Sequence, residues 1–177
     1  FEAPASWRMN LALDLVTANG YEITLEYNHD DVDQGVFYQD AGLTKTGTLA
    51  DGRGTYSGKG DYIMTNTDKG GADAYTFSVR KSFDNGITLY SAYSSVEAKD
   101  VYPLTSTQAE STYGYTQRWD GENLDAARSS FMSDSKFILA LEYRTQWWGD
   151  NETRISALYI KKDGEPYSIS FDEPGYN

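Results

Sequence analysis

The chain has 177 residues, of which 39% are hydrophobic and 15% aromatic, and its 27 acidic against 15 basic residues give a net charge of -12. This composition excludes a disordered chain and supplies enough apolar material for one folded domain. The acidic balance argues against nucleic acid as a partner, because such binding needs a basic surface. The absence of cysteine excludes disulfides, thiolate metal sites and a cysteine nucleophile.

The first predicted elements are two strands that form a hairpin. Residues 7–16 carry apolar side chains at odd positions and mostly polar ones at even positions, and residues 21–28 continue this alternation. Period two indicates strands with one apolar and one polar face. Asn19 and Gly20 tolerate the positive φ of the connecting turn. The charged residues on the polar face are Arg8, Asp14, Glu22 and Glu26.

The next segment extends this second strand. We expect residues 31–40 to continue it with a bend at Gly35, and residues 41–72, rich in Gly, Ser, Thr and Asp, to form a long loop. His29 is expected to be a solvated loop residue beside its acidic neighbours, since no serine nucleophile motif accompanies it. The acidic residues at 30, 31 and 33 lack the spacing of a calcium loop and are expected to be solvated.

Two more hairpins follow. Residues 75–80 and 87–93 flank a turn at Asn85-Gly86, and residues 137–144 and 154–159 flank a turn at Gly149-Asp150. Residues 167–171 predict a seventh strand, and residues 122–132 allow a turn or two of helix. The charged residues that the alternation places on the polar face of these hairpins are Arg80, Glu142, Arg144 and Arg154.

The second long loop, residues 99–134, is rich in aromatic side chains. Tyrosine and tryptophan among small polar residues suit contact with a ligand, because they offer large rigid surfaces with a polar group. The candidates are Tyr102, Tyr113, Tyr115 and Trp119. Alternatively, these side chains pack the loops against each other.

Turns that are short at one end of the strands and long at the other are typical of a transmembrane β-barrel. We therefore predict an all-β fold: an antiparallel barrel segment of about six to seven strands, with short periplasmic turns and long extracellular loops, in which residues 1–177 form part of one barrel domain. The eight charged residues named above would line the lumen. The aromatics expected at the membrane interface, beside the short turns, are Tyr21, Phe83, Trp147 and Trp148.

Residues 25–43, 81–86, 98–101, 149–153 and 164–168, in this order and spacing, give the chain a resemblance to a known family. From about residue 7 to about 171 it resembles the C-terminal barrel of large TonB-dependent outer-membrane receptors of Gram-negative bacteria, the Oar-like group. The resemblance implies a 22-stranded barrel in the outer membrane, surrounded by lipid and containing a plug domain. It also implies that a ligand bound at the extracellular loops is imported with energy from an inner-membrane TonB-type protein.

The resemblance covers about a third of such a barrel. The sequence shows no plug, no TonB-contacting segment and no terminal aromatic residue, so we expect the remainder of the receptor elsewhere in a longer polypeptide. The ligand could be a small molecule, a peptide or a glycan. No cofactor and no metal site are expected.

Two other functions remain open. A soluble or surface β-sandwich could bind carbohydrate through the aromatic loops, and a small stand-alone barrel could be a structural outer-membrane protein. An enzyme is not expected: Glu22, Glu26 and Glu142 resemble a glycosidase pair only in sharing one strand face, as carboxylates in a barrel lumen also do.

Overall fold

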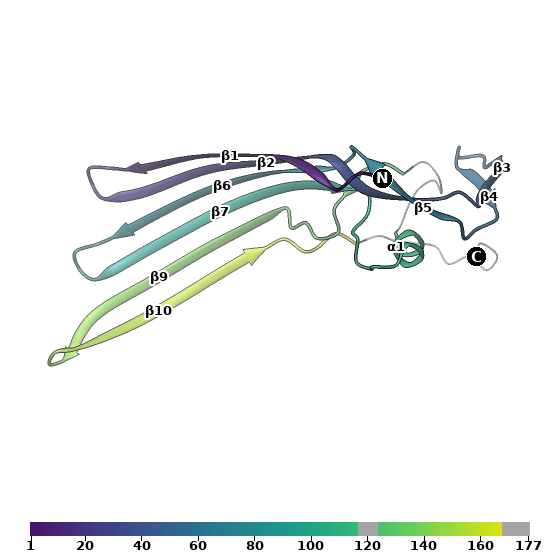
Figure 1. Cartoon of the computed structure of the whole chain (residues 1–177). Helices are drawn as coiled ribbons and strands as arrows, with labels where there is room; N and C mark the ends of the chain where they lie inside the picture. Colours follow the sequence, from purple (N-terminus) through teal and green to yellow (C-terminus); the bar gives the residue numbers. More distant parts are fainter. Residues whose placement is uncertain (117–123, 168–177) are drawn as a thin grey trace.

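The computed structural model describes residues 1–116 and 124–167. Its main feature is a curved antiparallel sheet of six long strands that lie side by side, with all three short turns at one end (Figure 1). The strands, in their order across the sheet, are β1 (Ala5–Val16), β2 (Tyr21–Asp40), β6 (Gly71–Ser82), β7 (Ile87–Asp100), β9 (Ser135–Trp148) and β10 (Asn151–Lys162).

The all-β class and the three predicted hairpins are confirmed. β1 pairs with β2, β6 with β7 and β9 with β10, all antiparallel. The predicted seventh strand lies outside the described residues, except for Tyr167, which belongs to no strand. Within the described chain the sheet is open, because β1 and β10 each have one neighbour along the sheet.

Glycine is required at the second turn. Gly86 has φ of 85°, and a Cβ there would lie 2.2 Å from the carbonyl oxygen of Arg144 on the neighbouring strand β9. The amide of Gly86 donates to the carbonyl of Phe83 at 3.1 Å, which closes the turn. Since only glycine combines this φ with so close an approach, the residue fixes where β6 ends and β7 begins.

β2 is longer than its neighbours and changes partner. It pairs with β6 as far as Asp31 opposite Gly71, and from Gly35 onward it pairs with β5 (Tyr62–Thr67). The predicted extension of β2 to residue 40 is therefore confirmed. The expectation of a loop over residues 41–72 is wrong for much of its length, because β5 and the hairpin of β3 (Thr44–Thr48) and β4 (Gly54–Ser57) lie within it. We call β2 from Gly35 onward, with β3, β4 and β5, the distal ribbon (Figure 1).

The buried core of the described chain lies beside the distal ribbon rather than on the long sheet. Here the only described helix, α1 (Ala109–Tyr115), contacts β2 and β5, and the short β8 (Ala127–Arg128) pairs with β7. The helix predicted around residues 122–132 is wrong over residues 124–132, which form β8 and turns. The buried cluster contains Val101, Tyr102, Tyr113 and Leu124, packed against Phe37, Tyr38, Leu43, Tyr62 and Ala126.

Candidate functional site

The long sheet has two faces of constant residue parity. Apart from one irregular pair at each outer end of the sheet, every cross-strand pair in the six long strands joins two odd or two even positions. Leu13 pairs with Leu25, Leu25 with Phe77, and Phe77 with Tyr93. Because side chains alternate along a strand, all odd residues share one face, the apolar face, and all even residues share the other, the polar face.

The apolar face is largely exposed. Leu11 and Leu13 are 59% and 53% exposed, and the described residues place no second sheet across them. The apolar face ends on the side away from the short turns, where the row beyond Tyr27 and Tyr75 contains His29, Asp73 and Glu97. A continuous exposed apolar surface of this extent marks a site of association rather than an ordinary solvent-facing sheet.

All eight charged residues predicted for a lumen lie on the polar face, where most contact polar neighbours. Arg8 forms an ion pair with Asp30, and Asp14 accepts a hydrogen bond from Thr24 at 2.6 Å. Glu142 pairs with both Arg144 and Arg154. Glu22 lies opposite Arg80 in the strand register. Leu158 and Ile160 of β10 depart from the pattern and carry apolar side chains on this face.

The sheet is sheared in one direction. One row of paired residues crosses it from Val16 through Glu22, Arg80, Tyr90 and Ala140 to Leu158. This row passes three positions from the first turn centre (residue 19), five from the second (85) and nine from the third (149). From the first turn to the third, the distance between this row and the turn therefore grows by six residues over four strand spacings, so the turns are staggered.

This shear gives the inclination of the strands. At about 3.3 Å per residue and about 4.8 Å between strands, the turns are staggered by roughly 20 Å along the strands over roughly 19 Å across them. The strands are thus inclined by about 45° to the normal of the line through the three turns. Figure 1 shows the same stagger, in which the turns project stepwise farther from the β1–β2 turn to the β9–β10 turn.

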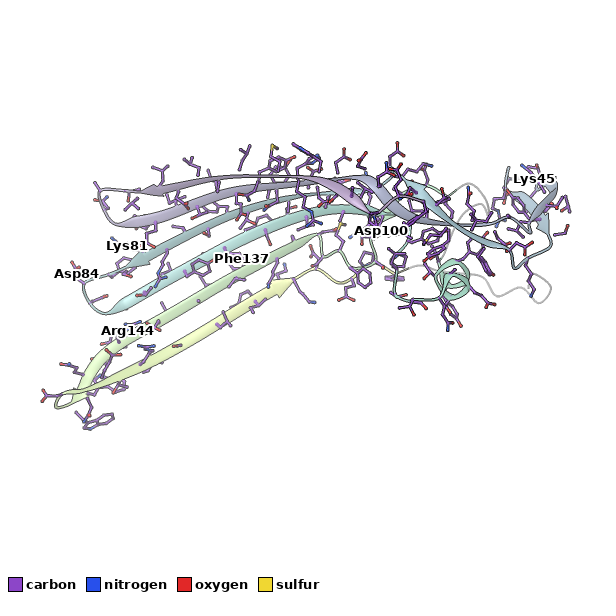
Figure 2. All side chains as sticks on the ribbon, viewed as in Figure 1. Lys45, Lys81, Asp84, Asp100, Phe137 and Arg144 are labelled. Atoms are coloured by element: carbon purple, nitrogen blue, oxygen red, sulfur yellow. The ribbon has the colours of Figure 1, made fainter. Side chains whose placement is uncertain are left out.

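The four predicted interface aromatics lie at the turn end. Tyr21 begins β2, Phe83 begins the second turn, and Trp147 and Trp148 end β9 with their ring centroids 5.9 Å apart. Lys81 accompanies them (Figure 2): its Nζ donates to the carbonyl of Asn19 and lies 5.1 Å from the Tyr21 ring centroid and 5.6 Å from that of Phe83. A lysine whose ammonium reaches a turn at the end of the sheet, beside aromatic rings, is typical of an apolar–polar boundary.

Two of the four predicted ligand-contact residues are buried. Tyr102 and Tyr113 are 5% and 4% exposed, and the Tyr102 hydroxyl donates to the carbonyl of Tyr38 at 2.5 Å. This corrects the expectation of ligand contact for both and favours the alternative, loop packing, because a ring enclosed by β2 and α1 offers no surface to a ligand. Tyr115 is 82% exposed. Trp119 lies outside the described residues.

Two carboxylates contact the segments beyond the long sheet, one exposed and one buried. Lys69 donates to the carbonyl of Leu124 at 2.9 Å and pairs with Asp125 at 3.0 Å, which joins the second long loop to the start of β6. The ammonium of Lys69 holds the pKa of Asp125 below its ordinary value. Asp40, only 2% exposed, accepts hydrogen bonds from the amides of Gly42, Gly60 and Asp61 and so anchors the base of the β3–β4 hairpin.

Sequence reasoning missed the environment of His29. The residue lies within β2, and its Nδ1 is 2.9 Å from a carboxylate oxygen of Asp73, which also accepts a hydrogen bond from the Tyr27 hydroxyl at 2.6 Å. The expectation of a solvated loop histidine is therefore wrong. Its partner is 44 positions away, so only the β2–β6 register could have revealed the contact.

Neither a membrane-spanning helix nor a metal site emerges from the described residues. No helix among them is long and apolar enough to cross a membrane. No group of three or more histidine and carboxylate side chains in the same residues is arranged to hold a metal ion. Comparisons with protein-family models, curated proteins and solved structures find no match to this chain.

Proposed function

We propose that the six-stranded sheet is part of the wall of an outer-membrane β-barrel, with its apolar face toward lipid and its polar face toward the lumen. The observation that carries this proposal is the sheared, two-faced register. An inclination of about 45° agrees with the tilt of about 35–45° in transmembrane barrels. The nine residues from Trp7 to Leu15 match the length of about 9–11 that a tilted strand needs to cross the hydrocarbon core.

The open edges fit the same proposal. In lipid, each unpaired backbone group costs several kcal/mol, so β1 and β10 require neighbouring strands. A larger barrel supplies these strands, which agrees with the resemblance to TonB-dependent receptors. A sandwich would instead need a second sheet over Leu13, Leu25 and Phe77, and the described residues supply none.

From that resemblance we further propose that the chain is part of a TonB-dependent receptor in the outer membrane of a Gram-negative bacterium. The receptor would bind a ligand at its extracellular loops and import it with energy from the inner membrane, through a plug domain carried elsewhere in the polypeptide. The chain would contribute wall, lumen lining and the outer loops. No enzymatic role is proposed.

The first test is the intact mass of the native polypeptide that carries this sequence, taken from the outer-membrane fraction. The receptor proposal expects a mass several times the 19.8 kDa of this chain. A native polypeptide of about 19.8 kDa would contradict it. Recovery of the polypeptide from the soluble fraction, without detergent, would contradict the membrane wall as well.

A further inference from the structure

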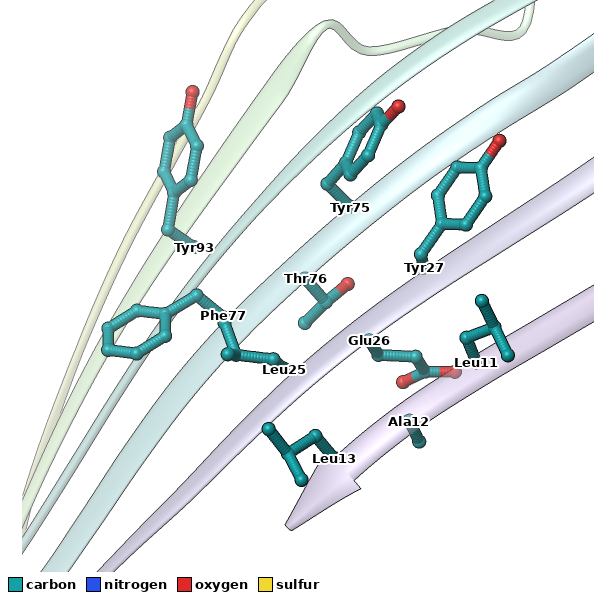
Figure 3. Close-up of a pocket in the computed structure, with 10 residues that line it drawn as sticks. All are labelled: Leu11, Ala12, Leu13, Leu25, Glu26, Tyr27, Tyr75, Thr76, Phe77 and Tyr93. Carbon is teal, nitrogen blue, oxygen red and sulfur yellow. The ribbon is translucent and has the colours of Figure 1, made fainter. Parts of the chain in front are cut away.

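The apolar face carries a groove of about 400 Å³ across β1, β2, β6 and β7 (Figure 3). It runs between two rows of paired residues. One row is formed by Leu11, Tyr27 and Tyr75, and the other by Leu13, Leu25, Phe77 and Tyr93. The side walls of the groove are therefore aliphatic and aromatic.

No charge faces this groove. Glu26 lies along it, but its carboxylate accepts hydrogen bonds from Asn10 at 2.7 Å and Asn28 at 3.1 Å, and all three residues belong to the polar face. The carboxylate is thus held on the opposite side of the sheet. A charged ligand would find no partner in the groove, whereas an uncharged hydrocarbon chain would lose no hydrogen bonds by entering it.

The groove has a hydrogen-bonded polar rim along the side away from the short turns. The hydroxyl of Tyr27 is bonded to Asp73, which also contacts His29 in the row beyond. The next row toward the short turns is apolar at Leu15, Ile23 and Val79 and carries Ser91 on β7. One apolar side and one hydrogen-bonding side match the polarity of an amphiphile whose head lies toward the distal ribbon.

We propose that this groove holds one acyl chain of a membrane lipid from the leaflet farther from the short turns. The proposal rests on the membrane wall proposed above and names the partner of its apolar face. In this position the chain lies across four strands, between the Leu11 and Leu13 rows, with its head group at the level of Tyr27 and His29.

The test uses the full native polypeptide, purified in mild detergent, and native mass spectrometry to count the phospholipid and lipid A molecules that resist collisional removal. Leu25→Trp fills the groove. Ile23→Trp is the matched control, because Ile23 lies on the same strand and face but not in the groove. We expect the unmodified protein and Ile23→Trp to retain one lipid and Leu25→Trp to lose it. Leu13→Trp, at the residue paired with Leu25 in the same row, provides a second loss.

Equal retention by Leu25→Trp and Ile23→Trp, or no retained lipid in the unmodified protein, would overturn the groove proposal. Flotation of each variant with phosphatidylethanolamine and phosphatidylglycerol vesicles separates the two proposals. Protein that floats without a retained lipid contradicts the groove alone, whereas protein that does not float contradicts the membrane wall and the groove together.

Discussion

Leu25→Arg should reduce the free energy of unfolding far more than an arginine on the opposite face of the sheet. Leu25 lies six residues from the turn centre at residue 19, so with about 3.3 Å per residue and a tilt of about 45° its Cα is roughly 14 Å above the turns. That is near the middle of an apolar band about 25 Å tall. There an arginine is expected to reduce the free energy of unfolding by about 2–4 kcal/mol.

The matched control is Ser78→Arg. Ser78 lies on the polar face, paired with Thr24 and Ala92, at nearly the same level of the sheet. An arginine there faces the lumen, so we expect a loss below about 1 kcal/mol. The assay is reversible urea unfolding of the full polypeptide in phosphatidylcholine vesicles, followed by fluorescence. Equal losses for the two variants, or a larger loss for Ser78→Arg, would refute the assignment of the faces.

Three further predictions concern the turns and the outer segments. Gly86→Ala should lower the free energy of unfolding by more than Gly149→Ala. Both glycines have positive φ, but of the two only Gly86 would bring a Cβ within 2.2 Å of a backbone atom, the carbonyl oxygen of Arg144. Equal losses in thermal unfolding would show that this close approach is unimportant. Asp40→Ala removes the buried carboxylate that accepts hydrogen bonds from the amides of Gly42, Gly60 and Asp61, at a cost of about 1–3 kcal/mol, and should speed proteolysis within residues 41–61. Asp51→Ala, at the exposed hairpin tip, should leave the cleavage unchanged, and unchanged cleavage in Asp40→Ala would contradict the anchor. Because Lys69 depresses the pKa of Asp125, the contact between the second long loop and β6 should persist from pH 7 down to the ordinary aspartate value of 3.8 and be lost as the pH falls further through the lowered pKa. Amide hydrogen exchange of residues 124–126 should rise in that lower range, and Lys69→Gln should produce the same rise at pH 7. A rise near pH 6 would instead point to another group.

The elements that could be predicted from the sequence are those specified by neighbouring residues. Asn85 and Gly86 mark a turn on their own, and the alternation around it assigns each side chain to a face. Because the turns preserve parity, all eight predicted charged residues share one face of the sheet, although they come from five of its strands. The extension of β2 to residue 40 followed from the same local pattern.

What could not be predicted depends on contacts between distant segments. β5 pairs with β2 after the β3–β4 hairpin, and nothing in residues 62–67 alone names that partner. A tyrosine suits a ligand surface and a small core equally well, so the burial of Tyr102 and Tyr113 followed only from the docking of α1 against β2 and β5. The contact of His29 with Asp73 likewise required the register between β2 and β6.

The most direct test of the membrane wall is a thiol-accessibility scan along β2. This chain has no cysteine, so single substitutions from Ile23 to Asn28 can each be labelled alone if any cysteines elsewhere in the full polypeptide are first removed. In intact outer membranes, a water-soluble maleimide should react with the even positions 24, 26 and 28 and leave 23, 25 and 27 protected. Uniform labelling, or reaction at the odd positions with protection of the even ones, would contradict the account.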